Sequence, residues 1–209
     1  MNLRAPAILV AVRQHGETAV IARMLTEEYG LVAGYVAGGR GRRLRPVVIP
    51  GNSLDLELRA KSDSQLPFAR IELVTSRAAW MREPLAAAAI QWACALTAGT
   101  LPERNPYPAL YQGLGGLLEA VCHAPSARGW LAAMVGYETI LLRDLGYGRA
   151  AERPNMNDGF ETQFAAFRQL HRPIRDYLFA ERRGNVMMAR VALGERLARM
   201  LGPNTEPGF

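Results

Sequence analysis

Lysine is almost absent from this chain, because Lys61 is the only one and arginine supplies the other basic residues. Such a strong preference for arginine over lysine can reflect codon bias. The positions of the arginines are therefore better evidence for function than their number. The chain still has 25 basic against 19 acidic residues, a formal charge of +6 and a pI near 9.8. This balance argues for a polyanionic partner.

Cysteine and long apolar runs are also scarce. Cys94 and Cys122 are the only cysteines and form no CxxC pair, which argues against a disulfide scaffold or a structural zinc site. We expect two buried thiols in a reducing compartment. The apolar runs Ala5–Val12 and Leu85–Ala98 are too short to span a bilayer, and no small-residue cleavage site follows the first. We therefore expect a cytoplasmic protein.

Catalytic and cofactor motifs are missing as well. The three histidines, His15, His123 and His171, are isolated from any nucleophile motif, and no HExxH, GxSxG or GxxxxGK[ST] sequence occurs. The adjacent acids Glu27 and Glu28 would point apart at a strand end rather than share a proton. We expect no enzyme activity, no catalytic residue, no metal ion and no cofactor.

The first eighty residues or so have the two-residue period of strands. The clearest alternation, in Leu54–Arg59, sets leucines against charged residues. Turn residues separate five such segments, and we predict strands at residues 8–13, 19–25, 31–37, 54–59 and 68–75. Five short strands joined by turns favour a small closed barrel, since closure leaves no exposed edge.

From about Arg82 the period becomes helical. Helices are predicted at 84–99, at 109–122, after Ser126 as N-cap up to Gly146, at 160–170, and after Asn185 as N-cap. The inner face of the last helix would carry Val186, Ala189, Leu193, Leu197 and Met200. The chain is thus expected to be an α+β protein of two domains, a barrel over residues 1–79 and an all-helical domain over residues 80–209.

The third predicted strand is followed by four arginines that are interleaved with glycines, namely Arg40, Arg42, Arg43 and Arg45. No acid lies between Tyr29 and Leu54, so this charge has no neighbour in sequence to neutralise it. Two strands holding a mobile arginine loop could bind a phosphate backbone, with Tyr35 as a stacking platform for bases. The alternatives are a solvated surface loop and a tyrosine half-buried in the core.

A second basic zone is formed by Arg168, Arg172 and Arg175, and it continues to Arg182 and Arg183. Pro173 interrupts the helical spacing, and Asp176 and Glu181 lie close enough in sequence to neutralise part of the charge. Contact with nucleic acid and a merely solvated helix surface both remain open for this zone.

Two sequence motifs stand out. The first is Leu25-Thr26-Glu27-Glu28 with Gly30, followed by Ala37-Gly38-Gly39-Arg40 and the further arginines. The second runs from Tyr137 to Gly146 and reads Y-E-T-I-L-L-R-D-L-G. Both motifs resemble those of the RecO family of bacterial recombination mediators, and the second is similar to the family pattern F-E-x-x-L-L-x-x-L-G. Their order, on strands followed by helices, fits the resemblance over nearly the whole chain.

The resemblance implies an OB-fold barrel followed by a helical domain. It implies binding of single- and double-stranded DNA, annealing of complementary strands, and loading of the recombinase onto single strands coated by single-strand-binding protein. The implied partners are the RecR protein and the acidic C-terminal tail of single-strand-binding protein. Two features depart from the family: the zinc-site lobe of many relatives is apparently lost near residues 147–160, which contain no cysteine, and Gly38 replaces a frequent lysine.

Two rival functions remain open. An RNA-binding OB-fold protein of translation or RNA processing would prefer RNA to DNA of equal length, because RNA offers the 2′-hydroxyl. A protein-interaction adaptor, in which the arginines only keep the surface soluble, would show no affinity for nucleic acid at low salt.

Overall fold

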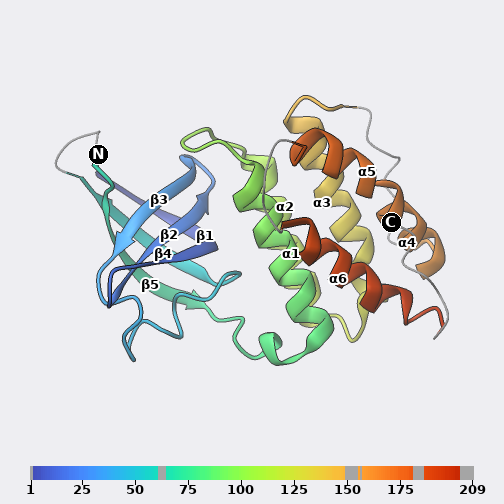
Figure 1. Cartoon of the computed structure of the whole chain (residues 1–209), viewed down its shortest axis with the longest axis horizontal. Coiled ribbons are helices and arrows are strands. Elements are labelled where there is room, and N and C mark those ends of the chain that lie inside the picture. The colour runs from blue at the N-terminus through green and yellow to red at the C-terminus, as the bar shows by residue number, and fades with distance from the viewer. Residues whose placement is uncertain (1, 61–64, 149–154, 156, 181–185, 203–209) are drawn as a thin grey trace. The chain divides into compact units, whose positions relative to one another are not determined.

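The computed structural model describes residues 2–60, 65–148, 155, 157–180 and 186–202. It confirms the predicted fold class, with five strands followed by helices (Figure 1). The chain divides into two compact units, one of residues 1–82 with 94–111 and one of residues 83–93 with 112–209. We propose that the domain boundary lies between residues 79 and 80.

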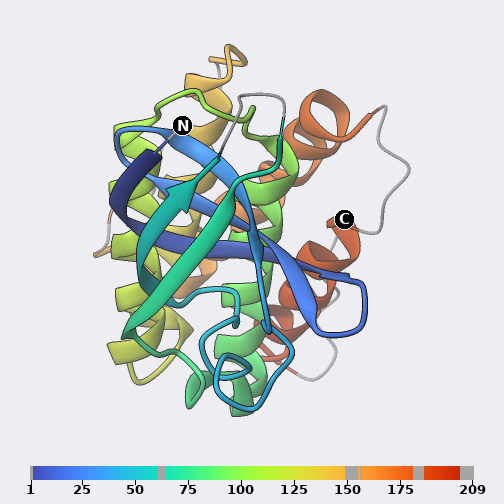
Figure 2. The same cartoon turned by 90° about the vertical axis from the view of Figure 1, so that its left-hand side faces the viewer.

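The barrel closes in the strand order β1-β2-β3-β5-β4, which is that of an OB-fold (Figure 2). Its neighbouring strands pair antiparallel except for the parallel contact of β3 with β5. The strands are β1 (Asn2–His15), β2 (Ala19–Thr26), β3 (Gly30–Val36), β4 (Ser53–Arg59) and β5 (Phe68–Thr75).

Strand β1 is longer than its sequence pattern predicts, because it begins at Asn2 rather than at Ile8. Its first half pairs with β4 and its second half with β2, with a shift in register between Leu9 and Ala11. The early residues were missed because Arg4 and Pro6 interrupt the apolar pattern. Both are exposed, and Pro6 lies opposite Asp55 of β4.

The barrel interior is filled by side chains from alternate positions of the strands, as the period of two requires. The three leucines of β4 are at most 2% exposed, which confirms the face assigned from their alternation. The remaining interior residues are Leu3, Ala7, Leu9, Val20, Ala22, Met24, Val32, Val36 and Ile71.

The turn between β2 and β3 explains the first part of the family-like motif. The hydroxyl of Thr26 accepts a hydrogen bond from the backbone N–H of Tyr29 (3.1 Å) and donates one to the carbonyl of Gly30 (2.9 Å). Gly30 has φ of 65°, and a Cβ atom there would lie 2.0 Å from the carbonyl oxygen of Asn105. Thr26 and Gly30 are therefore required by the turn itself.

The helical segments are α1 (Pro84–Thr100), α2 (Pro108–His123), α3 (Leu131–Asp144), α4 (Phe160–Gln169), α5 (His171–Pro173) and α6 (Val186–Ala198). Short turns η1 (Trp80–Arg82), η2 (Ala127–Gly129) and the π-helical η3 (Ile174–Leu178) accompany them. Among the described residues, none of these helices has the length and apolarity needed to cross a membrane.

The prediction that Ser126 caps a helix was wrong. Its side chain makes no capping hydrogen bond, and the short turn η2 separates it from α3, which begins only at Leu131. The cap predicted at Asn185 lies outside the described residues. Along α6 the buried residues include Leu193 and Leu197 as expected, whereas Val186 and Ala189 are half-buried. Met200, expected on the same face, lies beyond the end of α6 and is also half-buried.

Candidate nucleic-acid interface

The segment between β3 and β4, residues 37–52, is called here the arginine loop; Figure 2 shows it coiled at the lower end of the barrel. Where the sequence predicts a mobile loop, the structure has successive hydrogen-bonded turns. Backbone N–H groups of Gly41, Leu44 and Val48 donate to the carbonyls of Gly38, Gly41 and Leu44 at 2.9, 3.1 and 3.0 Å. Leu44, Val47 and Val48 pack against the barrel interior, so the loop is anchored along its length.

Asn52 holds the end of the arginine loop. Its fully buried side-chain amide donates to the carbonyls of Pro46 (3.1 Å) and Val47 (3.0 Å), and its carbonyl accepts the backbone N–H of Arg77 (2.8 Å). Sequence reasoning missed this role, because an asparagine after Pro50-Gly51 has the pattern of an ordinary turn residue. The consequence is a loop whose position is set by the barrel.

The four loop arginines fall into two groups. Arg42, Arg43 and Arg45 are exposed, and within the described residues no ion pair involves them. Arg40 is also exposed, but its guanidinium donates to the carbonyl of Glu17 (2.8 Å) and its backbone N–H to that of Thr18 (2.9 Å). Arg40 thus ties the loop to the β1–β2 turn, while the other three keep their donors available for a ligand.

Tyr35 lies outside the barrel interior and is half-buried on the outer face of β3. Its ring makes T-shaped contacts with His15 and Phe68, with centroids 5.7 and 5.3 Å away. Sequence reasoning singled out only Tyr35, because the pairing of β3 with β5 that brings Phe68 beside it is not visible in the sequence. A stacking role for Tyr35 stays a proposal.

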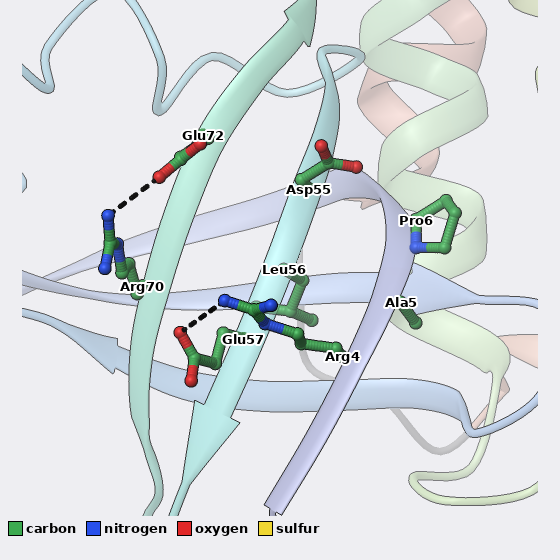
Figure 3. Close-up of a pocket in the computed structure, with 8 residues that line it drawn as sticks. All are labelled: Arg4, Ala5, Pro6, Asp55, Leu56, Glu57, Arg70 and Glu72. Atoms are coloured by element: carbon green, nitrogen blue, oxygen red, sulfur yellow. Dashed lines mark hydrogen bonds and ion pairs between the residues drawn. The ribbon is translucent and has the colours of Figure 1, made fainter.

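The outer surface of β1, β4 and β5 forms a shallow hollow with a different charge pattern, which we call the β1–β4–β5 face (Figure 3). Arg4 lies 3.6 Å from Glu57, and Arg70 lies 3.0 Å from Glu72. A hydrogen bond from Arg59, helped by the charges of Arg59 and Arg4, lowers the pKa of Glu57. Because each of these arginines has a carboxylate partner, this hollow is poorly suited to a polyanion.

The helical basic zone is also partly neutralised. Arg175 donates to Asp176 at 2.7 Å, and this hydrogen bond lowers the pKa of the Asp176 carboxyl. Arg168 is exposed and lies over the ring of Phe164, 6.0 Å from its centroid, and Arg172 is exposed. Arg182 and Arg183 lie outside the described residues. A nucleic-acid contact by Arg168, Arg172 or Arg175 remains a proposal.

A buried ion pair in the helical unit was not found from the sequence. Arg190 of α6 and Glu138 of α3 are both 0% exposed and are joined by two hydrogen bonds, of 3.0 and 2.8 Å. Arg190 also donates to the carbonyl of Phe167 (2.6 Å), and the indole of Trp92 donates to Glu138 (2.7 Å). The possible signal was Glu138 itself, an acid between the apolar residues of α3.

His171 completes this buried cluster, which we call the Arg190 cluster. Its Nδ1 lies 3.4 Å from a guanidinium nitrogen of Arg190. Burial, followed by the positive charges of Arg190 and Arg175, lowers the pKa of His171 to about 4. The imidazole is therefore neutral near pH 7 and can act as an acceptor for the guanidinium.

Two family models match the chain: "Recombination protein O N terminal" over residues 1–77 and "Recombination protein O C terminal" over residues 81–153. The first covers the barrel and the second begins just before α1. The chain belongs to the RecO family. Arg168, Arg172, Arg175 and Arg190 follow the end of the second match.

Similar RecO proteins, each named DNA repair protein RecO, come from Ruegeria sp. (strain TM1040), Gluconacetobacter diazotrophicus and Phenylobacterium zucineum. They are 40%, 39% and 40% identical over 149, 151 and 149 residues, or 71% of this chain. The same stretches cover 61%, 59% and 60% of the relatives, so the match spans about three fifths of their length.

The departures from the RecO pattern can be placed in part. Gly38 has φ of 65°, a conformation that favours glycine over a side chain such as lysine. A four-cysteine zinc site does not fit this chain, which has two cysteines in all. Cys94 is buried, which raises the pKa of its thiol to about 12, whereas Cys122 is only half-buried. Residues 149–154 and 156 of the predicted lost lobe lie outside the described residues. The described part of the chain contains no group of three side chains that could hold a metal ion.

Proposed function

We propose that this RecO-family chain is a DNA-binding recombination mediator of DNA repair, acting without a catalytic group. The observation that carries the proposal is the exposure of Arg42, Arg43 and Arg45, which make no ion pair within the described residues, on an anchored loop. Guanidinium groups bind phosphate oxygens in pairs and keep their charge at any physiological pH. The names of the relatives support a role in DNA repair.

The proposed mechanism is electrostatic. Two single strands repel each other as polyanions, and a cationic loop that binds phosphates of both lowers the cost of bringing them together. On this basis the protein binds single- and double-stranded DNA, anneals complementary strands and helps to load the recombinase onto strands coated by single-strand-binding protein. Arg40 contributes less than the other three, because its guanidinium already serves the β1–β2 turn.

The proposed protein partners are RecR and the acidic C-terminal tail of single-strand-binding protein. They rest on membership of the family, and the structure assigns neither partner to particular residues. A peptide that ends in acidic residues and phenylalanine should bind the full chain at low salt. Failure of that peptide to bind would remove the tail from the proposal without touching DNA binding.

The decisive experiment is annealing of complementary strands, with and without coating by single-strand-binding protein. The wild-type chain should accelerate annealing of both substrates, and replacing Arg42, Arg43 and Arg45 together by alanine should remove most of the acceleration. Arg70→Ala is the matched control, because Arg70 is also exposed but is paired with Glu72. A wild-type chain that accelerates neither reaction contradicts the proposal, and stronger binding to RNA than to DNA of equal length favours the RNA-processing alternative.

A further inference from the structure

An exposed aromatic row lies on the outer face of the barrel. Phe68 exposes 65% of its surface, the largest value among the exposed large apolar side chains of the described residues. Its neighbour Tyr35 is flanked on the other side by His15, which is also exposed. A phenylalanine exposed to this extent leaves apolar surface in contact with water, which is unfavourable. Binding of a ligand that covers the ring is therefore favoured.

The strand register extends this row to a cation. Arg13 of β1 lies opposite Ile21 of β2, Ile21 opposite Tyr35 of β3, and Tyr35 opposite Phe68 of β5. Residues directly opposite one another project from the same face of a sheet. Arg13 is exposed, and within the described part of the chain no ion pair involves it.

The row also continues into the arginine loop. His15 is the last residue of β1, and the turn that follows it is the one held by Arg40, through the carbonyls of Glu17 and Thr18. The rings of His15, Tyr35 and Phe68 therefore share one face of the barrel with Arg13, and His15 lies next to the turn that Arg40 holds. Accessible rings beside cations are the pattern that binds an unpaired strand, in which phosphates and base faces are both available.

We propose that Phe68 and His15, supported by Tyr35, stack against the bases of a single DNA strand whose phosphates contact the arginine loop. This inference rests on the proposed function and adds a basis for distinguishing single from double strands. In a duplex the bases are already stacked on one another, so only the phosphate contacts remain. An unpaired strand gains the ring contacts as well.

The test compares a thymidine oligonucleotide with an abasic oligonucleotide of equal length, which keeps the phosphates and lacks the bases. The full wild-type chain should bind the thymidine strand roughly fivefold more tightly or better. Phe68→Leu should remove most of this preference while leaving the abasic affinity unchanged, and Phe68→Trp should retain it. Val74→Ala, on the same strand and also highly exposed at 59%, should leave both affinities as they are.

The outcomes separate this inference from the proposed function. Equal wild-type affinity for the two oligonucleotides, or an equal loss for both in Phe68→Leu, overturns the stacking inference and leaves phosphate binding intact. A change in oligomeric state of Phe68→Leu without a change in base preference would assign the ring to a protein contact and also overturns it. If alanine at Arg42, Arg43 and Arg45 leaves both affinities unchanged, the arginine loop does not bind the phosphates, and the electrostatic basis of the proposed function fails.

Discussion

The arginine loop and the Arg190 cluster use the same side chain in opposite ways. In the loop, Arg42, Arg43 and Arg45 are exposed and make no ion pair within the described residues. In the cluster, Arg190 is fully buried and donates to Glu138 and to the carbonyl of Phe167, with the ring of Phe167 centred 3.9 Å from its guanidinium carbon. The first arrangement leaves donors for a ligand, and the second uses them inside the protein.

The difference shows why the number of arginines says little about function. A buried guanidinium has lost its hydration, so its stability depends on every hydrogen bond that replaces water. An exposed guanidinium without a carboxylate nearby keeps both its charge and its hydration, and exchanges the latter for phosphate oxygens on binding. Measurements of folding stability and of DNA binding should therefore respond to different arginines.

The largest expected effect is on the Arg190 cluster. Arg190→Leu leaves Glu138 as a buried charge without its guanidinium, and we expect the free energy of unfolding to fall by about 3–5 kcal/mol. Urea unfolding measures the loss. The control is Arg199→Leu, because Arg199 is exposed just beyond α6 and should tolerate the change. If the free energy of unfolding falls by the same amount in both variants, Arg190 contributes no more to stability than an exposed arginine.

A smaller effect is expected for Asn52, the buried polar residue that anchors the arginine loop. Asn52→Ala removes the hydrogen bonds of its side chain to the carbonyls of Pro46 and Val47 and to the backbone N–H of Arg77, which should lower the free energy of unfolding by about 2–3 kcal/mol. Because the loop loses its anchor, affinity for single-stranded DNA should fall as well. Asn2→Ala, at an exposed position of β1, serves as control. An Asn52 variant with wild-type stability and affinity contradicts the anchoring role.

The next effect concerns pH. Above the ordinary pKa of 6.5, His171 is neutral in the folded and unfolded states, so it adds no pH dependence there. Between pH 6.5 and about 4 only the unfolded chain takes up the proton, so the free energy of unfolding falls as pH falls. The slope is at most about 1.4 kcal/mol per pH unit, and His171→Asn should lack it. Parallel stability curves for the two proteins would show that His171 does not stay neutral in the fold.

The smallest effect is expected on the β1–β4–β5 face. Arg4→Ala and Arg70→Ala each remove an exposed arginine that already has a carboxylate partner. The salt dependence of single-strand binding should stay at its wild-type value, because no phosphate contact is lost. A reduced dependence in either variant would extend the DNA surface over this face and weaken the contrast with the arginine loop.

Much of the barrel could be predicted from the sequence, because strand period and turn residues are local signals. The leucines of β4 and the turn at Gly30 are examples. The first half of β1 was not predicted, since Arg4 and Pro6 hide a strand that only pairing with β4 reveals. The Ser126 cap failed for a similar reason: a serine before a helix is a local signal, and the turn η2 displaced it.

The charge of the candidate site could be predicted from the sequence, but the contacts that hold the arginine loop in place could not. The arginine run is visible in the sequence, but its anchoring depends on Asn52 reaching Pro46 and Val47, and on Arg77 from beyond β5. In the same way Phe68 joins Tyr35 only through the pairing of β3 with β5. Contacts between residues far apart in sequence decided what the pattern left open.

The central claim is tested most directly by the salt dependence of single-stranded DNA binding. With Arg42, Arg43 and Arg45 replaced together by alanine, the slope of log affinity against log salt should become shallower by about 2, or roughly 0.7 for each lost phosphate contact. The folded state should be as stable as that of the wild type. An unchanged slope in this variant would contradict the account and place the DNA elsewhere on the protein.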